Sequence, residues 1–203
     1  MKITTIDQKT FYPEFVSAKH FESILSDALL ALEGEVWLIP NLVLREEKQC
    51  HNIDILMLGY IHNYACNTEH FKNLCVKSFC AAIEVKSHPI NKVSLRDNEI
   101  MAEYSNKQVN VSKQSINNRL ALINNPIFSG IKVVDLIYYD QISKNEINIL
   151  GEKIPSNVLC ADTSITNLWD VIGNSMHIPS QDGVISVTRD EQLIKDLVSN
   201  LVS

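Results

Sequence analysis

The chain has 203 residues, of which 45% are apolar and 21% charged, and its formal net charge at pH 7 is −6. This length and composition exclude intrinsically disordered, collagen-like and low-complexity proteins, and they predict one globular domain over residues 1–203. The longest apolar runs, such as Ile53 to Leu58, fall well short of the roughly 20 residues that a membrane-spanning helix needs. We therefore expect a soluble protein with no membrane partner.

The N-terminus and the cysteines both indicate a cytoplasmic protein. Residues 1–7 contain neither the charged segment nor the apolar stretch of a secretory signal. The 5 cysteines are odd in number and widely scattered, which is typical of reduced thiols rather than of a disulfide framework.

The charge is unevenly distributed along the chain. Residues 86–132 carry seven basic and three acidic side chains, a net charge of +4, which leaves −10 for the remainder. A basic segment on an acidic body suits a protein that meets a polyanion on one face, although solvated surface lysines give the same count. The basic residues proposed to contact nucleic acid are Lys92, Arg96, Lys107, Lys113 and Arg119.

The first half of the chain predicts one helix followed by three strands. Apolar side chains recur at helical spacing over about residues 18–33, and Gly34 follows them. Three runs rich in aliphatic and β-branched residues predict strands at 36–44, 53–60 and 79–86. Residues 62–77 form an insertion between the second and third strands, with a short helix expected around Glu69 to Leu74.

A hairpin and a second helix are expected next. Residues 92–95 and 99–104 flank a turn and form the hairpin, and a helix follows over residues 111–124. The apolar stripe expected to face the core on this helix consists of Ile116, Leu120 and Ile123.

The last part of the chain predicts a fourth strand over 131–139, a short fifth over 157–160, and two further helices. These helices cover about 165–173 and 190–202, and Thr188 with Glu191 has the spacing of a capping box for the second of them. The order of elements predicts an α/β sandwich around a mixed sheet.

The third predicted strand carries the strongest chemical signal. With a two-residue period, Glu84 and Lys86 leave one face of the strand, while Ile83 and Val85 leave the other. Asp54 is the lone charge in the second predicted strand. Burying these charges is costly unless they are paired or bind a cation, because water solvates them better than protein does.

If these two strands are neighbours, Asp54 and Glu84 converge on one hard cation such as Mg²⁺, and Lys86 lies where it can orient or deprotonate a metal-bound water. These roles define metal-assisted phosphodiester hydrolysis. An isolated Glu-x-Lys is more often an ordinary ion pair at a strand end, so the proposal depends on Asp54 lying in the preceding strand.

The order of these motifs resembles a known family. Ile53-Asp54, Ile83-Glu84-Val85-Lys86 and Asn110-Val111-Ser112-Lys113-Gln114 at a helix start resemble the nuclease-related domain (NERD) of the PD-(D/E)XK nuclease superfamily. The resemblance covers about residues 18–173 and implies a restriction-endonuclease-like three-layer sandwich, with a mixed central sheet flanked by helices. Ile53 replaces the proline of the motif, and the 62–77 insertion is longer than the turn expected there.

This resemblance also implies roles for individual residues. Asp54 and Glu84 would bind Mg²⁺ or Mn²⁺, Lys86 would serve the water, and Gln114 would position the substrate or the lysine. Glu22 occupies the position of the family's glutamate in the first helix.

We therefore expect a metal-dependent nuclease that hydrolyses DNA phosphodiester bonds. It would bind DNA through contacts to the backbone phosphates. The alternative is a catalytically inactive nucleic-acid-binding or regulatory module on the same fold. Association into a homo-oligomer or with a separate helicase or effector chain stays open.

A zinc site is a further alternative, because seven cysteines and histidines lie between residues 50 and 80. They are Cys50, His51, His62, Cys66, His70, Cys75 and Cys80. The closely spaced pairs of a structural zinc site are missing among them, which argues against it.

Overall fold

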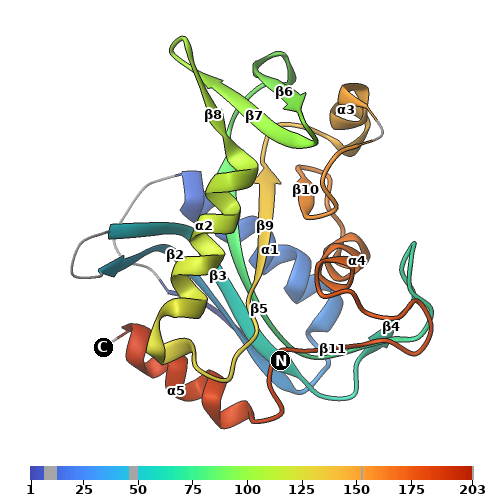
Figure 1. Ribbon diagram of the computed structural model, residues 1–203. Helices are drawn as coiled ribbons and strands as arrows, with labels where there is room; N and C mark the ends of the chain where they lie inside the picture. The colour runs from blue at the N-terminus through green and yellow to red at the C-terminus, as the bar shows by residue number, and fades with distance from the viewer. Residues whose placement is uncertain (7–12, 46–49, 152, 203) are drawn as a thin grey trace.

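The computed structural model describes residues 1–6, 13–45, 50–151 and 153–202. The described chain forms an α/β protein with a mixed central sheet packed against helices, plus a small antiparallel sheet (Figure 1).

The main sheet contains eight strands within the described residues. Six of them follow the order β1-β2-β3-β5-β9-β10, and β4 and β11 each pair with β5. The bounds are β1 (Lys2–Thr5), β2 (Gly34–Arg45), β3 (Cys50–Ile61), β4 (Ala65–Cys66), β5 (Leu74–Lys86), β9 (Val134–Tyr139), β10 (Val158–Cys160) and β11 (Val184–Ser186). The sheet is mixed, because β2, β3 and β5 pair antiparallel whereas β5, β9 and β10 pair parallel.

Helices cover both faces of this sheet. Their bounds are α1 (Pro13–Leu29), α2 (Val111–Asn124), α3 (Lys144–Ile147), α4 (Ile165–Ser175) and α5 (Glu191–Val202), with short 3-10 turns η1 (Ile90–Lys92), η2 (Pro126–Phe128) and η3 (Asn148–Leu150). One apolar core joins the sheet to α1 and α4, and a second joins the opposite face to α2 and α5. In Figure 1, α2 crosses in front of the sheet and α1 lies behind it.

The small sheet lies beyond the C-terminal ends of β5 and β9, at the top of Figure 1. It consists of β6 (Val93–Arg96), β7 (Glu99–Tyr104) and β8 (Lys107–Asn110), paired antiparallel in that order. Each connection is a two-residue turn in the left-handed region, with φ of 53° and 63° at Asp97 and Asn98, which suits tight hairpins because Asn and Asp tolerate this conformation. Asn110 then caps α2 by accepting a hydrogen bond from the backbone N–H of Lys113 at 2.9 Å.

Apart from the helix expected around Glu69 to Leu74, the predicted helices and strands are confirmed in their order, and so is the hairpin, to which the structure adds strand β8; strands β1, β4 and β11 were not predicted. Three local predictions are wrong. The segment from Glu69 to Leu74 is not helical, because it leads into an early start of β5 and is held by turns. The helix near the C-terminus is capped by Asp190, whose side chain accepts from Gln192 N at 2.9 Å, and not by a Thr188 capping box.

The third error concerns the face that α2 buries. The predicted apolar stripe is exposed, and the 40% exposure of Ile116 is representative of it. The helix instead turns toward the sheet a face that includes the polar residues Ser115 and Asn118, together with Leu122. Hydropathy alone chooses the wrong face here because buried polar groups on the sheet need partners from this helix.

No helix within the described residues is long and apolar enough to cross a membrane. All five cysteines are free thiols, as the sequence predicts. Trp37 and Trp169 are core residues.

Candidate active site

Two opposite charges are buried side by side at the C-terminal end of β5. Glu84 is 1% exposed and Lys86 is 6% exposed, and the Nζ of Lys86 donates to the Oε1 of Glu84. Both side chains leave the strand toward α2, as the two-residue period predicts. Burial lowers the pKa of Lys86, but the neighbouring Glu84 carboxylate, together with Tyr104 and Asp54, raises it by more, so the lysine stays an ammonium ion.

The second oxygen of Glu84 is held by α2. Asn118 Nδ2 donates to Glu84 Oε2 at 2.7 Å, and Asn118 is itself buried. Both Glu84 oxygens therefore have a hydrogen-bond donor, which offsets part of the cost of burying this polar group. Asn118 is not among the site residues predicted from the sequence. Its spacing could have indicated a role, because Asn118 follows Gln114 by one helical turn and lies on the same side of the helix.

Asp54 joins this pair from the neighbouring strand. The paired register of β3 and β5 ends at Ile55 and Ile83. One residue beyond it, Asp54 Oδ2 accepts a hydrogen bond from the backbone N–H of Val85 at 2.8 Å. The predicted adjacency of the two strands is therefore confirmed, and the carboxylate of Asp54 lies where their backbones stop pairing.

The strand is irregular at Asp54. Its neighbours Ile53 and Ile55 pack into the two different cores on opposite faces of the sheet, although residues two apart share a face in a regular strand. Opposite Asp54 in β2 stands Asn41, with φ of 54°, between the paired positions Pro40 and Leu42. The strand is therefore locally distorted at Asp54.

The electrostatics of Asp54 set it apart from ordinary carboxylates. Burial raises its pKa, the nearby charge of Glu84 raises it further, and the Val85 N–H and Lys86 only partly offset these effects, so that the pKa is about 7. Two carboxylates near one ammonium form a site that is short of positive charge, and such perturbed groups cluster at functional sites.

A third carboxylate approaches from α1. Glu14, the second residue of that helix, lies near enough for its charge to raise the pKa of Asp54, and its Oε2 is buried with no hydrogen-bond partner among the described residues. Glu22 was the glutamate expected here. The structure instead directs its carboxylate to the hydroxyl of Thr5 and to Lys19 Nζ, 2.7 Å away, so it is not brought together with Asp54 and Glu84.

The first helix is longer at its N-terminal end than predicted, which explains why Glu14 was missed. The helical spacing of apolar residues predicts a start near Ala18, whereas α1 begins at Pro13. Proline fits the first turn of a helix, because the N–H that it lacks has no partner there. Pro13-Glu14 was therefore the available signal.

Further groups surround Lys86 near the small sheet. Its Nζ lies 5.8 Å from the ring centroid of Tyr104, which in turn contacts the ring of His88 at 4.2 Å. Burial and the Lys86 charge lower the pKa of His88, so its ring favours the neutral form. Among the described residues, the buried atoms His88 Nδ1, Tyr139 OH and Asp140 Oδ1 have no hydrogen-bond partner. Orphaned polar atoms at one site are typical of places that water, ions or substrate complete.

Gln114 is half-buried on α2, one turn before Asn118 on the same side of the helix. No hydrogen bond joins it to Glu84 or Lys86, so the structure places it beside the site without a contact to the charged groups.

The proposed nucleic-acid contacts fall into two groups. Three of the basic side chains are engaged with carboxylates: Lys92 with Glu103 at 2.9 Å, Lys113 with Glu99 at 3.7 Å, and Arg119 with Asp135 at 2.9 Å. Arg96 and Lys107 are exposed at the two turns of the small sheet. The basic segment thus retains less unpaired positive charge than its composition suggests.

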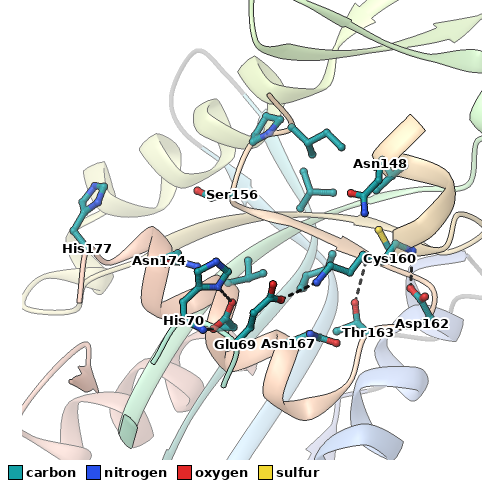
Figure 2. A pocket seen from close by; sticks show the side chains of 18 residues that line it. Glu69, His70, Asn148, Ser156, Cys160, Asp162, Thr163, Asn167, Asn174 and His177 are labelled. Carbon is teal, nitrogen blue, oxygen red and sulfur yellow. Dashed lines mark hydrogen bonds and ion pairs between the residues drawn. The ribbon is translucent and has the colours of Figure 1, made fainter. Parts of the chain in front are cut away.

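The cysteines and histidines weighed as a zinc site do not gather. Within the described residues, the one group with at least three potential metal ligands is Glu69, His70 and Asp170, and of the seven candidates it includes His70 alone (Figure 2). The Asp170 carboxylate already accepts from the Thr68 hydroxyl, the His70 N–H and the His70 ring. These bonds outweigh burial and lower the pKa of Asp170. The group is therefore internally satisfied.

Comparison of the chain with protein-family models, curated proteins and solved structures gave no match. The chemical interpretation therefore depends on geometry. Asp54, Glu84 and Glu14 can hold a hard cation, and Lys86 is a fixed ammonium beside them.

Proposed function

We propose that this protein is a divalent-metal-dependent nuclease that hydrolyses DNA phosphodiester bonds, on a restriction-endonuclease-like fold related to the NERD group of PD-(D/E)XK nucleases. One observation carries the proposal: Asp54, Glu84 and Lys86, from two strands, meet at the edge where those strands stop pairing. Folding alone does not require two carboxylates and a lysine there, because apolar residues of similar size would cost less to bury.

Asp54 and Glu84 would hold Mg²⁺ or Mn²⁺, with Glu14 next to them. The donor set fits this group, because hard cations prefer carboxylate oxygens. Glu14 Oε2 is buried with no hydrogen-bond partner among the described residues, and the pKa of Asp54 is about 7 although the Lys86 ammonium lowers it. When bound, the cation would polarise the phosphate and favour hydroxide near neutral pH.

The chain's own residues would orient the reaction. Lys86, held by Glu84, presents a fixed ammonium that attracts the phosphate and orients the attacking water. Asn118 fixes Glu84 in turn, since its amide donates to the other carboxylate oxygen. Arg96 and Lys107 at the turns of the small sheet would contact backbone phosphates of the DNA. Such contacts position the protein on DNA of any sequence.

A cleavage assay tests this function. The purified full chain is incubated with linear, supercoiled and single-stranded DNA and with RNA, in Mg²⁺, in Mn²⁺ or in chelator. Glu84→Gln and Lys86→Met are compared with Glu33→Gln and Lys77→Met, which alter exposed residues, the latter on the same strand β5. We expect metal-dependent DNA cleavage that the first two variants reduce at least about 100-fold and the controls retain.

Two outcomes would contradict the proposed nuclease activity. Cleavage that survives in both Glu84→Gln and Lys86→Met would come from a contaminant. Salt-sensitive DNA binding without cleavage in any metal would instead identify an inactive nucleic-acid-binding module on this fold, because phosphate contacts alone give such salt dependence.

A further inference from the structure

A cavity of about 490 Å³ lies at the sheet edge formed by β10, away from Asp54 and Glu84. Its walls come from β10, α4, the α3–η3 segment and the loop that contains His70 (Figure 2). This volume lies within the range of small-molecule sites, which are concave, mostly apolar and furnished with a few polar groups.

The charged side chains at this cavity already have ionic or hydrogen-bond partners within the protein. Lys144 Nζ lies 3.0 Å from Glu69 Oε2, and His70 is bonded to Asp170. Asp162 accepts from the backbone N–H of Lys144 at 2.9 Å. Three carboxylates against one ammonium oppose an anionic ligand, and that ammonium, on Lys144, is already paired with Glu69.

The uncharged lining offers a different kind of recognition. Ile154, Val158 and Val171 supply apolar walls, and Asn148 and Asn174 lie on opposite sides of the cavity in Figure 2. A side-chain amide carries a donor and an acceptor side by side, the arrangement that matches the edge of a nucleobase.

His70 adds an oriented ring to this lining. Its Nδ1 is bonded to the buried carboxylate of Asp170, which leaves Nε2 for a ligand. Such a carboxylate partner fixes both the orientation and the tautomer of an imidazole. The ring position is fixed further by the His70 backbone N–H, which donates to Asp170 at 2.9 Å.

We propose that this cavity binds an uncharged, planar heterocycle of the nucleobase type, as the free base or nucleoside, and rejects its phosphorylated form. The apolar walls would enclose the ring, while Asn174 and the free nitrogen of His70 bond its edge. The site is separate from Asp54, Glu84 and Lys86, so it does not depend on the nuclease function.

The test measures binding to the full chain by titration calorimetry. The probes are adenosine, guanosine, cytidine and uridine, with adenosine 5′-monophosphate and its counterparts as charged controls. We expect at least one nucleoside to bind saturably at one site below about 1 mM, and its monophosphate to bind at least about tenfold more weakly.

Variants locate the binding. Ser156→Trp adds a bulky side chain at an exposed position of the lining, and Asn174→Leu removes the amide; each should weaken binding at least about tenfold. Ser156→Ala and Glu84→Gln should leave binding unchanged. Circular dichroism confirms that each variant is folded.

Three results would overturn the proposal: no nucleoside binds at 1 mM or below (about −4 kcal/mol), the monophosphate binds as tightly as the nucleoside, or binding is unchanged in folded Ser156→Trp. Loss of nucleoside binding in Glu84→Gln would assign the nucleoside to the nuclease site instead. Failure of DNA cleavage has no bearing on these measurements.

Discussion

Asp54 accepts a hydrogen bond from the backbone N–H of Val85 at 2.8 Å, one residue past the last paired position of β3 and β5. The carboxylate thereby takes the place of a strand-to-strand bond, and it also stands next to the charge of Glu84. The hydrogen bond favours the ionised form of Asp54, but burial and Glu84 oppose it more strongly, and the pKa is about 7.

Removing the charge of Asp54 is expected to stabilise the protein without metal. Its folded pKa lies above its ordinary value, so its contribution to stability is full below pH 4 and is lost as the pH rises to about 7. Asp54→Asn keeps an acceptor for Val85 N–H and carries no charge. At pH 8 in chelator, we expect it to raise the free energy of unfolding by about 1–3 kcal/mol, as measured by urea denaturation.

The pH and metal dependence provide the controls for Asp54→Asn. At pH 4 the variant and the natural protein should differ little, because Asp54 is then protonated. Mg²⁺ should stabilise the natural protein at pH 8 and not the variant, since a ligand that binds the folded state alone raises stability. Asp27→Asn, at an exposed position of α1, is the matched substitution. Equal or lower stability of Asp54→Asn at pH 8 would contradict the electrostatic account.

The buried pair of Glu84 and Lys86 should show strong coupling. Each single change, Glu84→Gln or Lys86→Met, leaves an uncompensated buried charge and is expected to cost about 3–5 kcal/mol of stability. The double variant should be more stable than the sum of the two single effects predicts, because neither charge then remains. A double-mutant cycle by urea denaturation measures this coupling. Additive effects would show that the two side chains do not interact in solution.

Asn118 is expected to stabilise the protein by donating a hydrogen bond to Glu84, and not through its effect on helix α2 itself. Asn118→Leu removes the donor to Glu84 Oε2 and leaves a buried carboxylate oxygen unsatisfied, a loss of about 1–3 kcal/mol. Asn117→Leu, an exposed neighbour on the same helix, should change stability by less than about 0.5 kcal/mol. Thermal and urea unfolding of both variants makes the comparison. Similar losses in the two would assign Asn118 no special role.

Much of the fold can be predicted from the sequence, because the longer helices and strands carry apolar residues at the spacing of their own structure. The limits of helix α2, Val111–Asn124, agree with the prediction, since Asn110 caps its start and Asn125-Pro126 ends it. The short strands β1 and β11 were missed. Runs of three or four residues acquire their structure from pairing with β2 and β5, which no local pattern records.

The residues of the candidate site that lie on strands were predicted from the sequence. The period of two places Glu84 and Lys86 together, and the isolated charge in an apolar run marks Asp54. The contributions of Glu14 and Asn118 depend on how two helices rotate against the sheet. Sequence gives this rotation through hydropathy, and on α2 the exposed Ile116 and Leu120 made the hydropathy misleading.

Asp170 gives a prediction of opposite sign to that for Asp54. Hydrogen bonds from Thr68 and His70 outweigh burial and lower its pKa, so its stabilising contribution is present above its ordinary pKa and is lost as the pH falls through the folded value. Asp170→Asn should lower stability at pH 7 by about 1–3 kcal/mol, and by less near pH 3. Urea denaturation at both pH values checks this, with Asp190→Asn as the matched control, because asparagine also caps a helix. A loss of equal size at both pH values would show that packing, not charge, is what Asp170 provides.

Glu14 and Glu22 give a direct comparison on one helix. Glu14 lies near enough to Asp54 to raise its pKa and has a buried oxygen with no hydrogen-bond partner among the described residues, whereas Glu22 is engaged by Thr5 and Lys19. If the protein cleaves DNA, Glu14→Gln should lower the rate about 10–100-fold at limiting Mg²⁺, and a higher Mg²⁺ concentration should restore part of it, since the variant weakens cation binding. Glu22→Gln should stay within about twofold of the natural protein, because a surface substitution away from the site changes little. A greater loss in Glu22→Gln than in Glu14→Gln would mean that Glu22, and not Glu14, is the glutamate of the first helix that serves the site.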